Sequence, residues 1–260
     1  MTITNVDDVR RIEDRAEARD LALQVYDDFV ADLEGVTGEQ WERITVCAPW
    51  TVADIARHVL GAAESGASKR EMIRQQIAAV RTRKQFDGNI LDAINNFQVA
   101  ERSHLAGKEV TVLIREIAPA AVEGRLGMPR LLDRVPAPAG AGGSAAPGMP
   151  TKVRLGDLFR VIYTRDVWLH RIDIATAFGK TPTIDSAADR RLIADVVKEW
   201  ADRHGRPFEL RLSDGAVFRR EGGGPVIELE PVELCWILSG RGQPDPTRPG
   251  ADLLLQRVLF

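Results

Sequence analysis

Cysteine is scarce in this sequence of 260 residues, which contains only Cys47 and Cys235. The two lie far apart, and neither has a second cysteine at the spacing of a metal site, so a disulfide framework is not expected. We expect both to be small buried hydrophobic residues. If the protein carries out thiol chemistry, the reacting thiol is then expected to come from another molecule.

Long apolar runs and an excess of positive charge are also absent. The first 20 residues are charged from Asp7 onward without the apolar stretch of an export signal, and no run of about 18 apolar residues follows. The formal net charge is −3, with the two signs well mixed, which gives little support to a nucleic-acid partner. We therefore expect a cytoplasmic protein that neither spans a membrane nor binds nucleic acid. The sequence does not indicate its oligomeric state.

Four segments in the first 180 residues carry the apolar spacing or the boundary signals of α-helices. Residues 6–34 contain no proline or glycine and repeat apolar residues on one helical face. Thr51 and Asp54 have the spacing of a capping box at the start of a second helix. Two more segments follow, at about 89–118 and at 155–180, where Gly179 is the stop signal. The pattern predicts a four-helix bundle over residues 1–180.

Residues 134–150 interrupt the helical pattern with a segment rich in proline, glycine and alanine. Such a composition does not build a core, and it predicts an exposed loop or linker. An active-site flap is the alternative for a loop of this length.

The character of the chain changes after residue 180, where a further helix is expected at 185–204. Three short β-rich runs then follow, separated by Asp-Gly and Gly-Gly-Gly turns that are typical of an antiparallel meander; they cover 208–215, 216–224 and 225–231. A short helix at 232–240 and a strand-like run at 253–260 complete the pattern. The fold class expected is therefore mainly α, with a four-helix bundle (1–180) followed by a smaller α+β domain (181–260).

Histidine is rare, and the spacing around one histidine points to a metal site. Asp166 and His170 are four residues apart in a helical segment, so both side chains project from one face and can share a metal ion. His58, from the second helix, adds a third ligand. Three protein ligands and one open position are the arrangement of a catalytic zinc, whereas a structural zinc is closed by four.

Simpler interpretations exist for the same residues. A single histidine on an apolar helix is more often a hydrogen-bonded core residue than a ligand, which applies equally to His104 and His204. An Asp–His pair four residues apart also forms ordinary surface salt bridges. Asp173, three residues after His170, is a second local partner, and we expect it to orient the imidazole.

Three motifs, in order along the chain, resemble those of the mycothiol-dependent maleylpyruvate isomerase family, part of the DinB-like four-helix superfamily. The sequence WTVADIARHVL at 50–60 is similar to its W-T-x-x-D-x-x-x-H motif, and RDVWLHRIDIA at 165–175 is similar to its second motif. PVELCWILSGR at 231–241 resembles the L-x-x-W-L-x-G-R element of its C-terminal domain. Together the three span about 190 residues of the chain.

The resemblance implies a DinB-like bundle that binds a divalent metal, zinc in the first instance, followed by an α+β domain. It implies mycothiol as cosubstrate, and metal ligands at His58, Asp166 and His170. The family has glutamate where this sequence has Asp166, and the shorter side chain withdraws the carboxylate by roughly one C–C bond, about 1.5 Å. The arginine of the third motif falls on Arg241, which the resemblance implicates in catalysis or in binding the substrate or cosubstrate. A helix cap or surface charge is the alternative for Arg241.

A metal-dependent thiol S-transferase or isomerase is the function most consistent with these residues. A metal deprotonates a coordinating thiol, whose pKa is otherwise about 8.5, and so prepares it to attack a small electrophile. Two alternatives stay open: a non-catalytic small-molecule binding protein with the same fold, and a zinc hydrolase in which water takes the open position. The sequence does not identify the electrophile.

Overall fold

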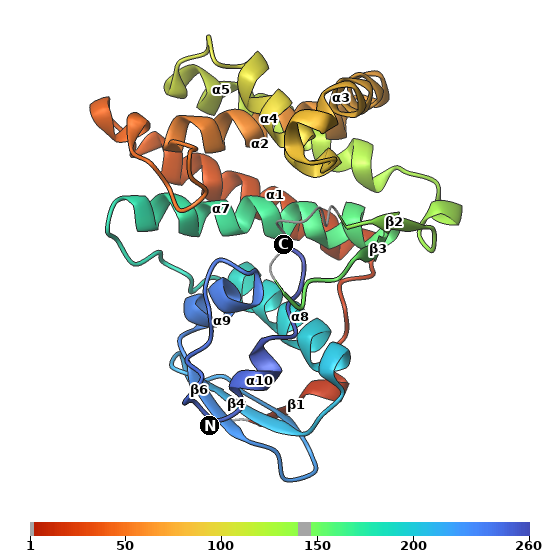
Figure 1. Cartoon of the computed structure of the whole chain (residues 1–260), viewed down its shortest axis with the longest axis vertical. Helices are drawn as coiled ribbons and strands as arrows, with labels where there is room; N and C mark the ends of the chain where they lie inside the picture. The colour runs from red at the N-terminus through yellow and green to blue at the C-terminus, as the bar shows by residue number, and fades with distance from the viewer. Residues whose placement is uncertain (1–2, 140–146) are drawn as a thin grey trace. The chain divides into compact units, whose positions relative to one another are not determined.

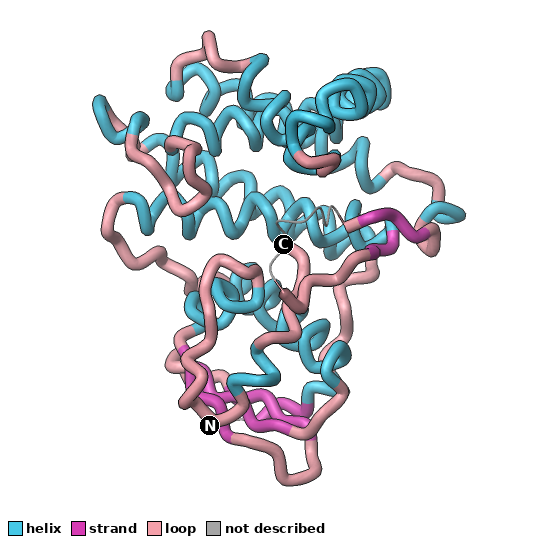
Figure 2. Tube along the Cα trace, viewed as in Figure 1, coloured by secondary structure: helices cyan, strands magenta, loops and turns pink. Residues whose placement is uncertain are grey.

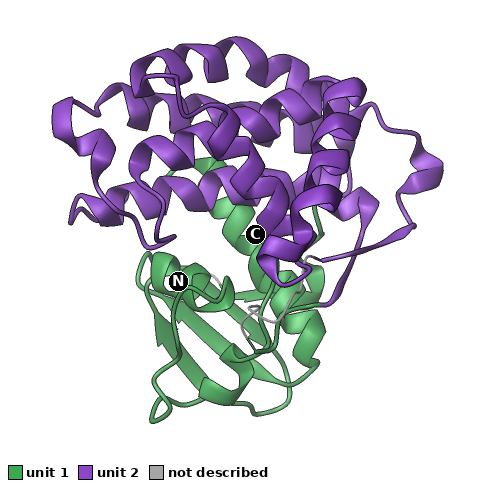
Figure 3. Cartoon of the chain, turned by 45° about the horizontal axis from the view of Figure 1, so that its top comes forward, with its two compact units in different colours: residues 1–12, 145–150, 183–260 green, residues 13–144, 151–182 purple. Residues whose placement is uncertain are grey.

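The computed structural model describes residues 3–139 and 147–260, and the chain forms two compact units (Figure 3). The larger unit comprises residues 13–144 and 151–182. The smaller unit comprises residues 1–12, 145–150 and 183–260. The expected boundary at residue 180 is close to the last division of the chain, at 182/183, whereas the first 12 residues belong to the smaller unit because they add a strand to its sheet.

The larger unit is a helical bundle (Figure 1). Its central helices are α1 (Arg15–Glu34), α2 (Val52–Ala67), α5 (Gly107–Leu126) and α7 (Tyr163–Ala177), in which α5 packs against α2 and α1, and α1 packs against α7. Beside α2 lies a helical pair made of α3 (Lys69–Thr82) and α4 (Ile90–Glu101). The helix α7 is preceded by the short α6 (Leu155–Asp157) and a π-helical turn, Leu158–Ile162. The expected four-helix bundle is confirmed.

Local signals in the sequence set the start of α2, the helix that carries His58. The Thr51 hydroxyl accepts from the Asp54 N–H at 3.2 Å, and the Asp54 carboxylate accepts from the Thr51 N–H at 3.1 Å. This reciprocal capping box satisfies backbone donors that the first helical turn otherwise leaves without partners, as the sequence predicted. The core beneath it is apolar, and its fully buried side chains include Phe29, Ile55, Leu60, Ile114, Leu169 and Ile172.

Two helix predictions were wrong at their boundaries. The first helix begins at Arg15 rather than at residue 6, because the buried Asp195 carboxylate accepts from the Ile12 N–H and from Arg11 Nε, both at 2.9 Å. These contacts hold the preceding segment out of a helix. The segment predicted at 89–118 is two helices, α4 and α5, with a turn between them. The apolar spacing continues across the turn, so it did not reveal the break.

Part of the proline- and glycine-rich segment forms one strand of a small antiparallel ribbon, whose second strand follows the segment. Its strands are β2 (Pro136–Pro138) and β3 (Lys152–Arg154), drawn in magenta in Figure 2. Residues 140–146 of the predicted loop lie outside the described residues. None of the helices in 3–139 and 147–260 combines the length and apolar content needed to cross a membrane.

The smaller unit is an α+β domain built on a four-stranded sheet. The strand order is β1-β5-β4-β6, and the strands are β1 (Ile3–Asn5), β4 (Phe208–Leu212), β5 (Val217–Arg220) and β6 (Val226–Leu229). Its helices are α8 (Ala187–His204), α9 (Pro231–Leu238) and α10 (Ala251–Leu254). The combination of a helical bundle and a small α+β unit is the fold class expected from the sequence.

The predicted antiparallel meander was wrong in part. Strands β4 and β5 form the expected hairpin, but β6 pairs in parallel with β4, on the side away from β5. The edge of β5 that a meander needs is occupied by β1, which comes from the start of the chain. The strand expected at 253–260 is also absent from that segment, which begins in α10; its apolar residues are instead buried, Leu253, Leu254 and Val258 each at 1% exposure or less.

Helices α2 and α5 approach each other closely at Gly66 and Gly124, which generates a prediction. A Cβ added at Gly124 would lie 2.2 Å from the carbonyl oxygen of Gly66 on α2. We expect Gly124→Ala to lower the free energy of unfolding by about 1–3 kcal/mol, because the two backbones must separate. Urea unfolding followed by far-UV circular dichroism measures the change.

Gly35→Ala is the matched control, because an added Cβ there makes only an ordinary contact at 3.5 Å. We expect this variant to unfold within about 0.5 kcal/mol of the wild type. Equal stability of the two variants would show that α2 and α5 tolerate separation at this crossing.

Candidate metal centre

Two helices of the larger unit bring the three predicted ligands together. His58 lies on α2, about one turn after Asp54 of the capping box, and Asp166 and His170 lie on adjacent turns of α7. His58 is 5% exposed and His170 is 3% exposed, so both imidazoles are held by the surrounding core. One nitrogen or oxygen atom of each of the three residues lies within 4.8 Å of the others.

The carboxylate of Asp166 lies between the two imidazoles. Its Oδ2 atom is 3.3 Å from Nε2 of His58, and its Oδ1 atom is 3.5 Å from Nε2 of His170. The two rings are close to perpendicular, with centroids 5.2 Å apart. On its other side the His58 ring packs against Trp50, at a centroid distance of 5.1 Å. The Asp166 side chain is 28% exposed, so the cluster can be reached from solvent.

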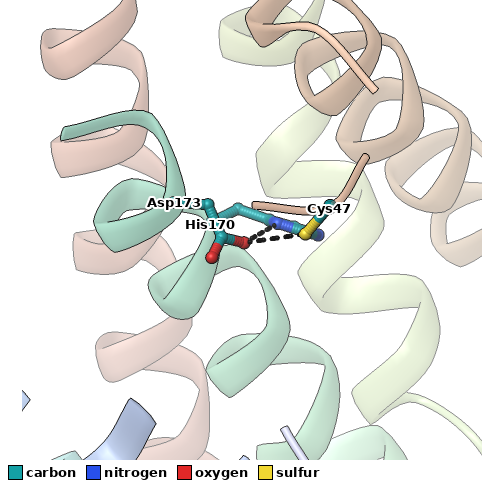
Figure 4. Close-up of side chains that lie close together, drawn as sticks. All are labelled: Cys47, His170 and Asp173. Atoms are coloured by element: carbon teal, nitrogen blue, oxygen red, sulfur yellow. Dashed lines mark hydrogen bonds and ion pairs between the residues drawn. The ribbon is translucent and has the colours of Figure 1, made fainter. Parts of the chain in front are cut away.

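A second carboxylate fixes the orientation of His170 (Figure 4). Nδ1 of His170 lies 2.8 Å from Oδ2 of Asp173, which is completely buried. This contact keeps a proton on Nδ1 and leaves Nε2 directed at Asp166, as in the carboxylate–histidine–metal arrangement. The orienting role expected for Asp173 agrees with this geometry.

The structure corrects the expectation for Cys47. Cys235 is buried as predicted, but Cys47 is partly exposed, and its thiol donates to the same Asp173 Oδ2 atom at 3.4 Å. Asp173 thus accepts from both the imidazole and the thiol (Figure 4). Cys47 precedes α2 in a segment with no regular pattern, so no local signal in the sequence placed it near His170.

The charges around His170 favour its protonated form in the protein without metal. Burial lowers the pKa of His170, but the Asp166 carboxylate, together with Asp173 and a hydrogen bond with Cys47, outweighs burial and raises this pKa to about 10. The imidazolium and the Asp166 carboxylate then form an ion pair. A metal ion that binds Nε2 has to displace this proton.

The donor set fits a divalent metal such as zinc. Two imidazole Nε2 atoms and one carboxylate converge from two helices, and three such ligands leave a position open for a further ligand. Nδ1 of His58 is buried and has no hydrogen-bond partner among the described residues, so its ring is held by packing against Trp50. The only observed hydrogen-bonding support for a ligand ring within the described residues is the one that Asp173 gives to His170.

The remaining predicted residue belongs to the smaller unit. Arg241 lies in the smaller unit, two residues after the C-cap of α9, where Gly240 has a left-handed φ of 86°. The two other histidines have different surroundings: His104 is exposed, and His204 packs against Trp200 and Phe208. Burial lowers the pKa of His204 to about 4, so it stays neutral at pH 7, as a core residue would.

Comparison with known proteins agrees with the fold. Residues 22–175 match the family described as "Mycothiol maleylpyruvate isomerase N-terminal domain". A crystal structure of the mycothiol-dependent maleylpyruvate isomerase has a TM-score of 0.55 and 14% identity, over 92% of each chain. A histidine-to-alanine mutant of the mycothiol-dependent maleylpyruvate isomerase has a TM-score of 0.54 and 13% identity, over 92% of each chain. No curated protein matches the sequence at a significant level.

The two kinds of comparison carry different weight. At 13–14% identity the solved structures establish the fold, over nearly the whole chain. The family match covers more than half of the 260 residues, and it contains all three of His58, Asp166 and His170. The resemblance seen in the sequence motifs is confirmed, and the chain belongs to the mycothiol maleylpyruvate isomerase family.

Proposed function

We propose that this chain is an enzyme that binds zinc through His58, Asp166 and His170 and uses mycothiol as cosubstrate in the isomerisation of, or S-transfer to, a small electrophile. The observation that supports it most is the pair of Nε2 atoms facing the two oxygens of one carboxylate, in a chain of this family. Because the solved relatives are mycothiol-dependent maleylpyruvate isomerases, maleylpyruvate is the first electrophile to test.

The chain's own residues prepare a site for a thiol. Bound zinc would supply a Lewis acid that favours the thiolate form of a coordinating thiol, which is mostly protonated when free at pH 7. Asp173 holds the His170 ring so that Nε2 faces the site, and packing against Trp50 holds His58. Asp166 reaches solvent, so its side of the cluster is where a thiol and an electrophile can approach.

The first prediction concerns metal content and its dependence on His170. We expect about one zinc per purified chain, bound through His nitrogen and Asp oxygen atoms at roughly 2.0–2.2 Å. His170→Ala should lose most of the zinc and keep its helical circular dichroism, because apolar contacts such as those of Leu169 hold α7 in the bundle. Atomic emission spectrometry beside far-UV circular dichroism gives both measurements.

His104→Ala is the control, since it removes an exposed histidine of the same unit. It should keep the zinc. Zinc near zero in the wild type after growth in zinc-replete medium, with no uptake on titration, would rule out the metal. Turnover of maleylpyruvate that consumes or requires mycothiol supports the isomerase or transferase, whereas turnover without thiol would indicate a hydrolase. Zinc without turnover of either kind would indicate a binding protein.

A pH dependence follows from the protonation of His170. Its pKa in the folded protein, about 10, lies above the ordinary value of about 6.5, so its charge stabilises the metal-free fold fully below pH 6.5. This contribution is lost as pH rises towards 10. We expect the melting temperature of chelator-treated protein to fall over this range, and to fall less steeply in His170→Gln. Zinc should stabilise the wild type more at pH 8.5 than at pH 6.5, because fewer protons then compete for Nε2.

Arg241 is proposed to bind the substrate carboxylate or the cosubstrate. If it does, Arg241→Lys should lower kcat/KM by about tenfold or more, since lysine cannot reproduce the planar pair of donors. The melting temperature should stay unchanged, because both side chains place positive charge after the C-terminal end of α9. Normal kinetics with a lowered melting temperature would instead identify Arg241 as a helix cap.

A further inference from the structure

Arg125, in the last turn of α5, is a buried arginine that has no carboxylate partner among the described residues. Arg125 is only 6% exposed. Nη2 donates to the hydroxyl of Thr164 at 2.7 Å, whereas Nε and Nη1 are buried without any hydrogen-bond partner among the described residues. A guanidinium stays charged in proteins, and a buried charge that lacks a partner is costly to the fold. The two unpartnered nitrogen atoms of Arg125 could therefore bind an anionic ligand.

Other buried arginines of the larger unit are balanced differently. Arg102 is also almost fully buried, but it forms an ion pair with Glu64 and donates to the Gln98 carbonyl at 2.8 Å. Arg160 pairs with Asp133 at 2.9 Å and with Asp157. Within residues 3–139 and 147–260, Arg125 alone has two buried side-chain nitrogens without partners. Its isolation is therefore not a general property of this bundle.

The surroundings of Arg125 connect it to the metal ligands. Its guanidinium carbon lies 6.0 Å from the ring centroid of Tyr163, the residue that follows the π-helical turn of Leu158–Ile162. Burial raises the pKa of the Tyr26 hydroxyl, Arg125 opposes that rise and Asp166 adds to it, so this phenol is within electrostatic reach of both residues. Turns of π-helix recur at functional sites, where they displace side chains from the regular helical register.

We propose that Arg125, with the Tyr163 ring and the Thr164 hydroxyl beside it, binds a carboxylate group of the electrophilic substrate next to the metal centre. A carboxylate supplies both the negative charge and the planar pair of acceptors that the unpartnered edge of a guanidinium matches. Tyr163 is 37% exposed and the Asp166 side chain 28%, so the neighbouring residues on α7 reach solvent. This proposal rests on the proposed function in one respect, namely that the bound carboxylate belongs to the electrophilic substrate.

Maleate, a small dicarboxylate, tests the site without requiring turnover. Isothermal titration calorimetry of the full-length protein, both as purified and after chelation, should detect maleate binding in each form. We expect Arg125→Met to weaken maleate binding by about 10- to 100-fold, the effect of losing a charge-assisted hydrogen bond. Without maleate, the melting temperature of Arg125→Met should equal or exceed that of the wild type, because an apolar side chain replaces an unbalanced buried charge. Neutral maleamide should bind to neither protein.

Two further variants keep the result interpretable. Arg102→Met removes a buried arginine that already has a carboxylate partner, so it should lower the melting temperature and leave maleate binding unchanged. Arg125→Lys keeps the charge but not the planar donors, and it should bind maleate more weakly than the wild type. If Arg125→Met does not fold, weaker binding in Arg125→Lys alone supports the proposal.

The proposal is overturned if the wild type does not bind maleate, or if Arg125→Met or Arg125→Lys binds it within about twofold of the wild type. Arg125 would then serve only the C-terminal end of α5, where a positive charge is favourable. A wild type that binds maleate in the chelated form but contains no zinc would sustain the anion site and reject the proposed metal. The two proposals therefore fail separately.

Discussion

The carboxylate of Asp166, placed between two imidazoles from different helices, is the contact on which the centre of the larger unit depends. Its two oxygens lie 3.3 Å and 3.5 Å from the Nε2 atoms of His58 and His170. Both imidazoles are buried whereas Asp166 reaches solvent, and the apolar faces of α2 and α7 fix the helices that carry all three side chains. The aspartate is one methylene shorter than the family's glutamate, yet it reaches both imidazoles from its position on α7.

Charged side chains lie on both sides of the His170 ring. Asp173 holds one side of the His170 ring and also accepts from the Cys47 thiol, while Asp166 faces the other side of the same ring. Two carboxylates around one imidazole keep it protonated until a cation replaces the proton. Beyond Asp166, the region is completed by Arg125, whose positive charge has no carboxylate partner among the described residues. The proposed metal and carboxylate positions together would suit a substrate that is both an electrophile and a carboxylate.

Local chemistry made much of this protein predictable from its sequence. Apolar spacing and a capping box predicted the helices that form the bundle and the start of α2, because helix formation and capping involve residues a few positions apart. The four-residue separation of Asp166 and His170 placed both on one face of α7 for the same reason. The sequence motifs that contain His58, Asp166 and His170 also pointed to the family that the chain belongs to.

Contacts between distant parts of the chain decided the rest. Asp195 holds residues 11 and 12 out of the first helix, and β1 takes the edge of β5 that a meander would use; neither effect has a local pattern. The contact of Cys47 with Asp173 joins residues 126 positions apart. Arg125 lacks a carboxylate partner among the described residues because of where it is buried, beside Thr164 of α7. The apolar spacing along α5 does not reveal this contact. The sequence by itself determined which side chains can bind a metal, and the tertiary structure decided which charges they meet there.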